Sequence, residues 1–351
     1  MPRVDFVTNC PLYDSFRVQQ IVGMFGLEGT SSSEIRVSAE LPSLEEEWNV
    51  GAIVGPSGAG KTTLARRAYA EYFHHPIAWP TDRAVIDGFP DFPIQKITQM
   101  LTAVGFGSPP HWLKPYSVLS GGEQFRCELA QALLKQKSLF VFDEFTSLLD
   151  RHSAQLLSAA VSKTIRRENR KFIAVTCHED VLPWLEPDWV YRADSGQLQR
   201  RRLRRPSIHL DVGPCRQAFW KSFADYHYLS GTLSPYATCW LGSWEGRPVA
   251  FAAVLHAIGQ RGLKRISRLV VHPLYQGLGI GSRFLQSIAG WYLCQGLRIR
   301  MSTSHPGMVH HLKHSVHWLV TDVQACRRND PRSGRGTVQS MRPLVSAEFL
   351  G

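Results

Sequence analysis

The feature that most constrains this chain is a glycine-rich segment, GPSGAGKT at residues 55–62, between an apolar run and a helix-forming stretch. The apolar run Val50–Val54 predicts a buried strand, and a helix is expected from Lys61 to about Phe73. This order forms a phosphate-binding unit, because the glycines let main-chain N–H groups surround phosphate oxygens. Lys61 adds a positive charge, and Thr62 offers a hydroxyl to Mg²⁺. The segment predicts an α/β domain with a nucleoside triphosphate site.

Two further segments fit such a site. Asp143 and Glu144 follow a short apolar run, and we expect Asp143 to hold Mg²⁺ through water and Glu144 to align and polarise the attacking water. Residues 119–123, LSGGE, open a helix expected to reach about Lys135. A serine and two glycines at a helix start form a second anion site from N–H groups and the helix dipole. One nucleotide needs one phosphate loop, so the second anion site is the distinguishing feature.

These residues resemble the ATP-binding cassette (ABC) family in order and spacing over about 180 residues. Residues 147–150 resemble its D-loop and His178 its switch histidine. The resemblance implies a head-to-tail, ATP-dependent homodimer in which Ser120 of one chain closes over ATP held by the other. It also implies catalytic roles for Glu144, His178 and Asp150, and Mg²⁺ binding by Thr62 and Asp143. The residues implied to contact ATP are Gly55, Pro56, Ser57, Gly58, Ala59, Gly60, Lys61, Thr62, Thr63, Ser120, Gly121 and Gly122.

The sequence departs from the ABC pattern in two places. Residues 62–119 are a shorter insert than transporter cassettes carry between the phosphate loop and the signature, so the helical subdomain that grips membrane partners is expected to be trimmed. No glutamine stands at the usual Q-loop position, where residues 85–88 (VIDG) place an aspartate and Gln95 lies further on. The adenine-stacking aromatic is expected to be Phe16 or Phe25. No apolar run of 18 residues occurs, so we expect no membrane span and a cytoplasmic ATPase.

A second glycine-rich loop lies near residue 280. Residues 265–273 predict a strand, and QGLGIG at 276–281 opens a helix expected to reach Cys294. Alternating glycines at a helix start offer N–H donors to a pyrophosphate. A dinucleotide-binding loop is the alternative, but no acidic residue follows about 20 positions on. The segment is similar to motif A of the Gcn5-related N-acetyltransferase (GNAT) family. This resemblance implies acetyl-CoA as cofactor, bound through Val270, Val271, Gln276, Gly277, Leu278, Gly279, Ile280 and Gly281.

The flanking pattern agrees with an acetyltransferase fold. It predicts strands at 208–212, 238–243, 249–257, 298–302 and 318–323, and helices at 216–226 and from Met308. We therefore expect an α/β chain with an ABC-type ATPase domain at 1–199, an arginine-rich linker at 200–206, a GNAT-like domain at 207–325 and a polar tail at 326–351.

The catalytic residues of acyl transfer are the least determined. No carboxylate stands on the strand at 269–271, and no tyrosine follows on the helix after Ser302. His227, Ser304 and His305 are the candidates, because a histidine titrates near neutrality, although each histidine is equally compatible with a structural role. The tetrapeptides DYHY (225–228) and TSHP (303–306) are similar to phage Mom-type DNA-modifying relatives of the GNAT fold.

A group of histidines follows in the same region. His310 and His314 share a helix face, as metal ligands would. No carboxylate or cysteine completes a ligand set nearby, so we expect a solvated helix that faces a polyanion.

Charge is divided unequally along the chain. Residues 1–199 carry 19 Lys and Arg against 23 Asp and Glu, whereas residues 200–351 carry 21 against 6. Five arginines stand at positions 200–205, as an exposed linker or as an edge strand that contacts a polyanion. The surplus of Lys and Arg over Asp and Glu after residue 199 predicts a nucleic-acid partner.

The seven scattered cysteines contain no C-x-x-C pair, which favours a reducing compartment.

The favoured function is ATP-gated, acyl-CoA-dependent N-acylation of a nucleic acid, in a phage or mobile-element setting. Three alternatives remain. The first is an ATP-dependent nucleic-acid clamp with a degenerate acetyltransferase domain. The second is a small-molecule or protein N-acetyltransferase with an ATPase regulatory module. The third is a transporter subunit that tags its cargo, which would need a membrane partner.

Overall fold

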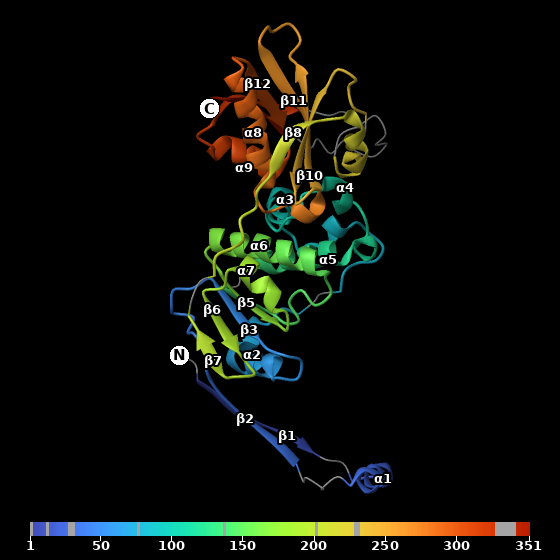
Figure 1. The fold of residues 1–351 in the computed structure, drawn as a ribbon, viewed down its shortest axis with the longest axis vertical. Coiled ribbons are helices and arrows are strands. Elements are labelled where there is room, and N and C mark those ends of the chain that lie inside the picture. Colours follow the sequence, from blue (N-terminus) through green and yellow to red (C-terminus); the bar gives the residue numbers. More distant parts are fainter. Residues whose placement is uncertain are drawn as a thin grey trace.

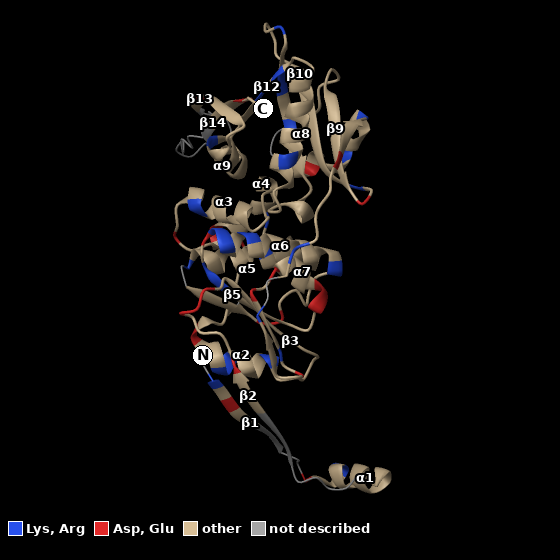
Figure 2. Cartoon of the chain, turned by 60° about the vertical axis from the view of Figure 1, so that its left-hand side comes forward, with Lys and Arg blue, Asp and Glu red and all other residues tan. Residues whose placement is uncertain are grey.

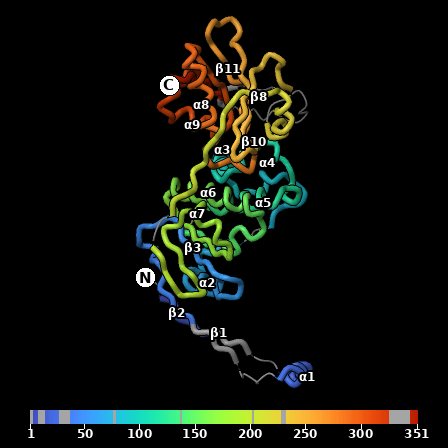
Figure 3. Tube along the Cα trace, in the orientation of Figure 1, coloured from blue at the N-terminus to red at the C-terminus, as the bar shows by residue number. Residues whose placement is uncertain are grey.

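The computed structural model describes residues 3–11, 14–26, 32–75, 78–135, 138–200, 203–227, 232–326 and 342–351. The molecule is elongated, with three parts along one axis (Figure 1). A two-stranded ribbon that carries helix α1 lies at one end, an α/β domain lies in the middle, and a second α/β domain lies at the other end. The tube in Figure 3 shows the chain passing from the middle domain to the last one through the segment that leads into β8, Asp211–Cys215. No described helix is both long and apolar enough to cross a bilayer.

The middle domain contains a five-stranded sheet in the order β4-β5-β3-β6-β7. Strands β4 to β6 run parallel and β7 antiparallel. Residues of β3 enter two different apolar clusters. Ile53 packs with helix α2 (Lys61–Tyr69), and Val50 packs with helices α5 (Gly121–Leu134) and α6 (Arg151–Arg167). Helices thus cover both faces, which is why β3 and β4 are continuous apolar runs. The strands are β3 Val50–Val54, β4 Leu139–Phe142, β5 Lys171–Thr176, β6 Trp189–Arg192 and β7 Gln197–Gln199.

The helices of this domain follow the predicted order. The helix predicted from Lys61 to about Phe73 ends at Tyr69 and is followed by a short 3₁₀ turn. The longer helices are α2 Lys61–Tyr69, α3 Ile94–Ala103, α5 Gly121–Leu134 and α6 Arg151–Arg167, and the short ones are α4 Pro109–Trp112 and α7 Leu182–Leu185. The 3₁₀ turns are η1 Ala70–Tyr72, η2 Val85–Gly88, η3 Tyr116–Val118 and η4 Glu179–Val181.

The N-terminal ribbon pairs β1, Arg3–Pro11, with β2, Ser32–Glu40, and carries α1, Phe16–Phe25. Figures 1 and 2 both place α1 at the far end of the ribbon, away from α2. The side chains of Phe16 and Phe25 are 75% and 67% exposed. The expectation that one of them stacks on adenine at this chain's own phosphate loop is therefore wrong, because the ribbon extends outward instead of folding back over the loop.

The last domain contains a seven-stranded sheet in the order β13-β14-β12-β11-β10-β9-β8. Only the β11–β12 pair is parallel in this sheet as described. Helix α8 packs on the sheet and α9 contacts β13. The strands are β8 Asp211–Cys215, β9 Thr238–Trp244, β10 Arg247–His256, β11 Leu263–Val271, β12 Arg298–Thr303, β13 Trp318–Cys326 and β14 Arg342–Phe349, and the helices are α8 Ile280–Cys294 and α9 Pro306–His314.

Three sequence expectations differ from this domain. The strand expected at 208–212 begins only at Asp211, and the helix expected at 216–226 is two 3₁₀ turns, η5 Gln217–Ser222 and η6 Ala224–Tyr226. The expected polar tail contains β14, which lies between β12 and β13. Val345 and Ala347 of β14 are fully buried. The alternation of apolar and polar residues in β14 is short and follows a polar stretch, so the sequence pattern did not predict a strand there. Residues 327–341 of that stretch lie outside the described residues.

The two α/β domains share an apolar junction. Ala159 and Ala160 of α6 and Trp184 of α7 belong to the same buried cluster as Trp244 and Tyr275 of the last domain. Trp184 and Trp244 meet edge to face with ring centroids 5.9 Å apart. Helix α3 also contacts α9, and α4 contacts η6. The short insert of the middle domain is therefore covered by the last domain.

Candidate active sites

The predicted phosphate loop lies at the carboxyl edge of the first sheet. Because β3, β4 and β5 are parallel neighbours, the segments that follow them meet at one edge. Gly58 and Gly60 have φ of +83° and +81°, values that a residue with a side chain rarely adopts. Helix α2 begins directly after Gly60 without a side-chain cap, so its first N–H groups stay available to phosphate oxygens.

The residues expected to bind Mg²⁺ are brought together at this edge. The hydroxyl of Thr62 donates to Oδ1 of Asp143 at 3.0 Å, and the ammonium of Lys61 donates to the carbonyl of Pro56 at 2.8 Å. A hydroxyl beside a carboxylate, next to a phosphate loop, is a donor set that Mg²⁺ accepts with a nucleotide. Thr62 and Asp143 therefore fit the predicted ion.

Glu144 and His178 lie at the same edge. Glu144 is exposed with φ of +51°, an uncommon conformation that is found in functional loops. His178 lies two residues after the end of β5. Its Nδ1 is buried without a hydrogen-bond partner among the described residues. An imidazole nitrogen without a partner beside a phosphate loop is available to a ligand. The predicted roles of both residues are compatible with this geometry.

The second predicted anion site is the start of α5. Ser120 caps the helix, and its side chain and that of Glu123 form a reciprocal capping box. Ser120 is exposed, and its hydroxyl donates to Oε2 of Glu123 at 2.9 Å. Glu123 also contacts His111. Burial alone would raise the pKa of Glu123, but hydrogen bonds from His111 and Ser120 hold it below its usual value. Asp150 likewise caps α6 by accepting from the N–H of Ser153. Ser120 and Asp150 are therefore both helix N-caps, in addition to their predicted roles at the nucleotide.

The last domain opens a cavity where β11 and β12 separate. The two strands pair only from Leu263–Arg298 to Ile266–Met301. A bulge follows at once, because Ile266 and Arg268 face consecutive residues of β10 and Ser267 has no strand partner there. Beyond it, the edge of β11 that faces β12 has no strand partner among the described residues. The resulting cavity of about 860 Å³ is lined by Val270 and Val271, as the acetyltransferase resemblance predicts.

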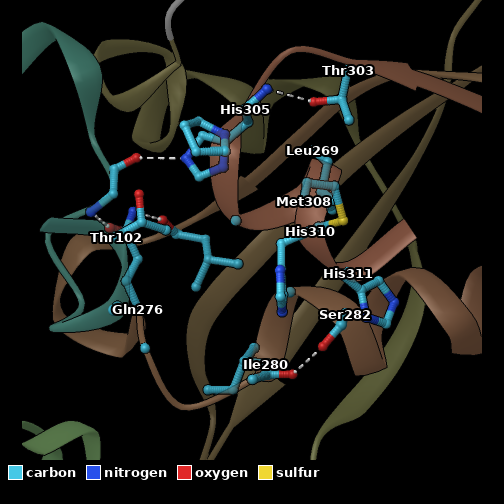
Figure 4. Close-up of a pocket in the computed structure, with 18 of the residues that line it drawn as sticks. Thr102, Leu269, Gln276, Ile280, Ser282, Thr303, His305, Met308, His310 and His311 are labelled. Atoms are coloured by element: carbon cyan, nitrogen blue, oxygen red, sulfur yellow. Dashed lines mark hydrogen bonds between the residues drawn. The ribbon is translucent and has the colours of Figure 1, made fainter. Parts of the chain in front are cut away.

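The glycine-rich loop forms one wall of this cavity (Figure 4). The lining residues of the loop are Gln276, Gly277, Gly279, Ile280 and Gly281. Helix α8 starts after Gly279, whose φ is +88°, and has no side-chain cap. The predicted pyrophosphate donors are therefore open to the cavity. Leu278 instead packs in the apolar cluster of the junction, which indicates a structural role.

Gln276 connects the loop to the middle domain. Its amide donates to the carbonyl of Val271 at 2.9 Å and accepts from the N–H of Gly107 at 2.6 Å. A Cβ on Gly105 would lie 2.7 Å from the carbonyl oxygen of Gln276, so a glycine there lets the two main chains approach. Gln276 thus positions the loop instead of directing its whole amide at a ligand.

The predicted acyl-transfer residues are distributed unequally around the cavity. His227 and His305 both line it. Ring Nε2 of His305 contacts the carbonyl of Gly107 at 3.0 Å, which makes Nε2 the protonated nitrogen and leaves Nδ1 as the basic one. Ser304 is half-buried and is not among the lining residues of the described chain. Tyr228 lies outside the described residues.

Several lining residues were not predicted as parts of this site. His310 and His311 line the cavity. The expectation was a solvated helix that faces a polyanion, but part of the histidine group on α9 faces this cavity. Thr102, Lys163 and Arg167 come from the middle domain. No local sequence signal could have identified them, because they reach the cavity only through the packing of one domain on the other.

Some of the basic residues after position 199 form ion pairs with carboxylates. Arg298 and Arg300 both bind Glu348, and Arg200 binds Glu46. The segment 203–210 forms neither helix nor strand, which corresponds to the linker alternative for the part described. Arg201 and Arg202 lie outside the described residues. Figure 2 shows lysine and arginine on α6 and α8, on the two sides of the junction.

Comparisons with known proteins agree with the two families that the sequence resembles. Residues 205–310 match the family model described as the acetyltransferase (GNAT) family. A probable metal transport system ATP-binding protein of Chlamydia trachomatis is 26% identical over 173 residues, covering 38% of this chain and 64% of that protein. The lipoprotein-releasing system ATP-binding protein LolD of Pseudomonas syringae is 36% identical over 106 residues, covering 30% and 44%. The chain thus spans less than two thirds of the length of each relative.

A solved structure is also similar to part of the chain. The ribosomal-protein-S18-alanine N-acetyltransferase of Escherichia coli is 12% identical, with a TM-score of 0.32, and the match covers 40% of this chain and 93% of that one. The ABC and GNAT resemblances and the α/β fold class are confirmed, while the likeness to Mom-type proteins stays a prediction. The chain joins an ABC-type ATPase domain on its N-terminal side to a GNAT-type acetyltransferase domain on its C-terminal side.

Proposed function

We propose that this protein is an acyl-CoA-dependent N-acyltransferase whose activity is controlled by ATP binding and hydrolysis in its ABC domain. The phosphate loop binds ATP, Thr62 and Asp143 hold Mg²⁺, and Glu144 aligns the attacking water. ATP closes two chains head to tail, with Ser120 of each over the nucleotide of the other. The contact between Thr62 and Asp143 beside an uncapped helix start supports the ATP site.

In the GNAT domain, the cavity between β11 and β12 holds the acyl thioester. The acceptor amine attacks the thioester carbonyl, a C–N bond forms, the C–S bond breaks, and CoA leaves as its thiolate, which His305 then protonates to the thiol with the proton taken from the amine. His305 Nδ1 takes the proton from the amine. Burial lowers the pKa of His305, although the hydrogen bond to Gly107 acts in the opposite direction, so the base form predominates near neutral pH.

The observation that carries the proposed control by ATP is that both domains line the acyl cavity. Helix α6 has 17 residues and begins beside Asp150 of the D-loop, which places its two ends about 25 Å apart. Its last turns reach the cavity through Lys163 and Arg167. A rigid helix that contacts the dimer interface at one end and the acyl site at the other transmits closure of the ATPase dimer to the acyl site.

The proposed acceptor is an amine of a nucleic-acid base. The surplus of 21 basic over 6 acidic residues after position 199 supports it, because phosphate backbones are bound through Lys and Arg. The pairing of Arg200, Arg298 and Arg300 with carboxylates favours the second candidate, an acetyltransferase acting on a small amine or a protein, because it reduces the charge available to a polyanion. The setting in a phage or mobile element is part of the first candidate.

Acetyl-CoA binding is tested by calorimetry on the full chain. Gly279→Asp places a carboxylate and a side chain where the pyrophosphate must approach, so we expect binding to be lost. Gly259→Asp is the matched control, because Gly259 also has a positive φ, of +75°, but lies in an exposed turn with open space around it. Equal affinity in both variants and the wild type would remove the loop from the site.

The acceptor is tested by mass spectrometry of nucleosides from DNA and RNA after incubation with acetyl-CoA and ATP. An acylated base that disappears in Gly279→Asp supports the nucleic-acid acceptor. Acetyl-CoA consumption that occurs only with small amines or protein added favours the second candidate. Binding of acetyl-CoA without turnover of any acceptor favours a clamp with an inactive transferase domain.

A further inference from the structure

Two cations of the ATPase domain line the cavity, and one of them, Lys163, lies beside the glycine-rich loop at residues 276–281, here called the acyl-CoA loop. Lys163 and Arg167 project from the last turns of α6 and line the cavity together with Gly279. The ammonium of Lys163 lies 3.0 Å from the position that a Cβ on Gly279 would occupy. Gly279 is the residue directly before α8, where the free N–H groups of that helix are found. A positive side chain and an uncapped helix start thus converge on one point from two domains.

The charge around this point is almost entirely positive. The pKa of Lys163 lies below its usual value, first because of desolvation and then because of the nearby charges of Arg205, Arg167 and Arg283. Among the described residues that line the cavity, Glu168 is the one acid, and it pairs with Arg167 at 3.1 Å. Cations gathered beside the N-terminus of a helix repel one another and the helix dipole. A multivalent anion bound at this point would reduce that repulsion.

We propose that Lys163 and Arg167 bind the pyrophosphate of acyl-CoA, so that the acetyltransferase site is completed by the ATPase domain. This inference rests on the proposed acyl-CoA function and adds a residue set to it that lies outside the acetyltransferase domain. The loop at 276–281 supplies main-chain N–H groups from one side, and the end of α6 supplies charge from the other. The isolated C-terminal domain would lack these two cations.

The experiment compares two ligands on the full chain. Acetyl-CoA contains the pyrophosphate, whereas S-acetylpantetheine has the same thioester and pantetheine arm without phosphate. The variants are Lys163→Met and Arg167→Gln, which remove the charge and keep an unbranched aliphatic stem that is shorter than the original side chain. Arg261→Gln is the matched control, because Arg261 is exposed in the turn between β10 and β11. Far-UV circular dichroism and thermal unfolding show whether each variant is folded.

We expect each of the two variants to weaken acetyl-CoA binding by about tenfold, because charge-assisted hydrogen bonds to phosphate are lost. S-acetylpantetheine binding is expected to be unchanged in both, and Arg261→Gln is expected to bind both ligands like the wild type. Adding 3′-dephospho-acetyl-CoA identifies the phosphate: the same tenfold loss is expected with it, because the pyrophosphate is still present.

Three outcomes overturn this inference. Wild-type affinity of Lys163→Met and Arg167→Gln for acetyl-CoA would mean that the two side chains do not contact the ligand. An equal loss for S-acetylpantetheine would mean that they only support the junction. A loss restricted to acetyl-CoA and absent for the dephospho compound would assign them to the 3′-phosphate. Failure of the wild type to bind any of the three ligands would instead contradict the proposed function itself.

Discussion

Gly107 of the ATPase domain donates its main-chain N–H to the side-chain oxygen of Gln276, in the glycine-rich loop at residues 276–281, at 2.6 Å. The same glutamine amide donates to the carbonyl of Val271 at the end of β11. The carbonyl of Gly107 in turn contacts His305. One residue of the ATPase domain therefore contacts both the glycine-rich loop at residues 276–281 and the proposed base of the acetyltransferase domain.

Replacing Gln276 by Leu should weaken the junction. The N–H of Gly107 and the carbonyl of Val271 would each lose a partner, and an unsatisfied, partly buried polar group costs about 1–3 kcal/mol. We expect the free energy of unfolding, measured in urea, to fall by about 2 kcal/mol, together with a weaker affinity for acetyl-CoA. Gln295→Leu, at an exposed glutamine on the C-terminal side of α8, should change neither. Unchanged stability in Gln276→Leu would mean that the bridge does not hold the domains together.

Removing the carboxylate of Glu144 should separate ATP binding from hydrolysis. Glu144→Gln keeps the shape of the side chain but cannot polarise the attacking water, so we expect ATP to bind and turnover to slow by at least about 100-fold. The ATP-bound variant should accumulate as a dimer in size-exclusion chromatography with Mg²⁺. A monomer at saturating ATP would contradict the head-to-tail arrangement.

Two further variants control the Glu144 experiment. Lys61→Ala removes the positive charge from the phosphate loop and should abolish nucleotide binding and the dimer together. Ser120→Arg should bind ATP but fail to close, because the arginine occupies the exposed start of α5 that the partner's nucleotide must reach. Mixing Ser120→Arg with Lys61→Ala restores at most one composite site.

Acid should loosen the contact between His305 and the ATPase domain. The pKa of His305 lies below its ordinary value of 6.5 because burial disfavours the charged ring. In the window just below pH 6.5 the unfolded chain binds more protons than the folded one, so stability falls as the pH falls. We expect a lower free energy of unfolding at pH 5.5 than at pH 7.5, and a smaller difference in His305→Gln, which keeps a donor for Gly107 and does not titrate. An identical pH dependence in this variant would remove His305 from the explanation.

The surplus of basic residues in the segment 200–351 predicts salt-sensitive binding of nucleic acid without ATP. Counterion release gives a slope of log affinity against log salt of about −0.9 for each phosphate neutralised on duplex DNA. Replacing Arg200, Arg201, Arg202, Arg204 and Arg205 by alanine should flatten this slope by several units and leave acetyl-CoA binding intact. Because Arg200 is already paired with Glu46, its single replacement should have the smallest effect. No binding to duplex or single strands at about 50 mM salt would favour a small-molecule or protein acceptor.

The sequence was sufficient for the elements whose chemistry is local. The strand at Val50–Val54, the loop before Lys61 and the acidic pair after Phe142 were predicted because backbone conformation and ligand type there depend on adjacent residues. The same holds for the loop at 276–281, where positive φ at Gly277 and Gly279 requires glycine. The C-terminal strand β14 and the 3₁₀ turns before His227 were missed, because their burial depends on partners far away in the chain.

Only the tertiary structure decided that the two sites are parts of one assembly. By sequence, residues 62–119 are merely a short insert and Lys163 is one cation among many on an amphipathic helix. Packing of the last domain on α3, α4 and α6 places Lys163, Gly107 and Thr102 around the cavity between β11 and β12. Local patterns specify what each loop can bind, because those contacts come from neighbouring main-chain groups. Which side chains of the ATPase domain reach the cavity depends on contacts between residues more than 100 positions apart, and no local pattern records these.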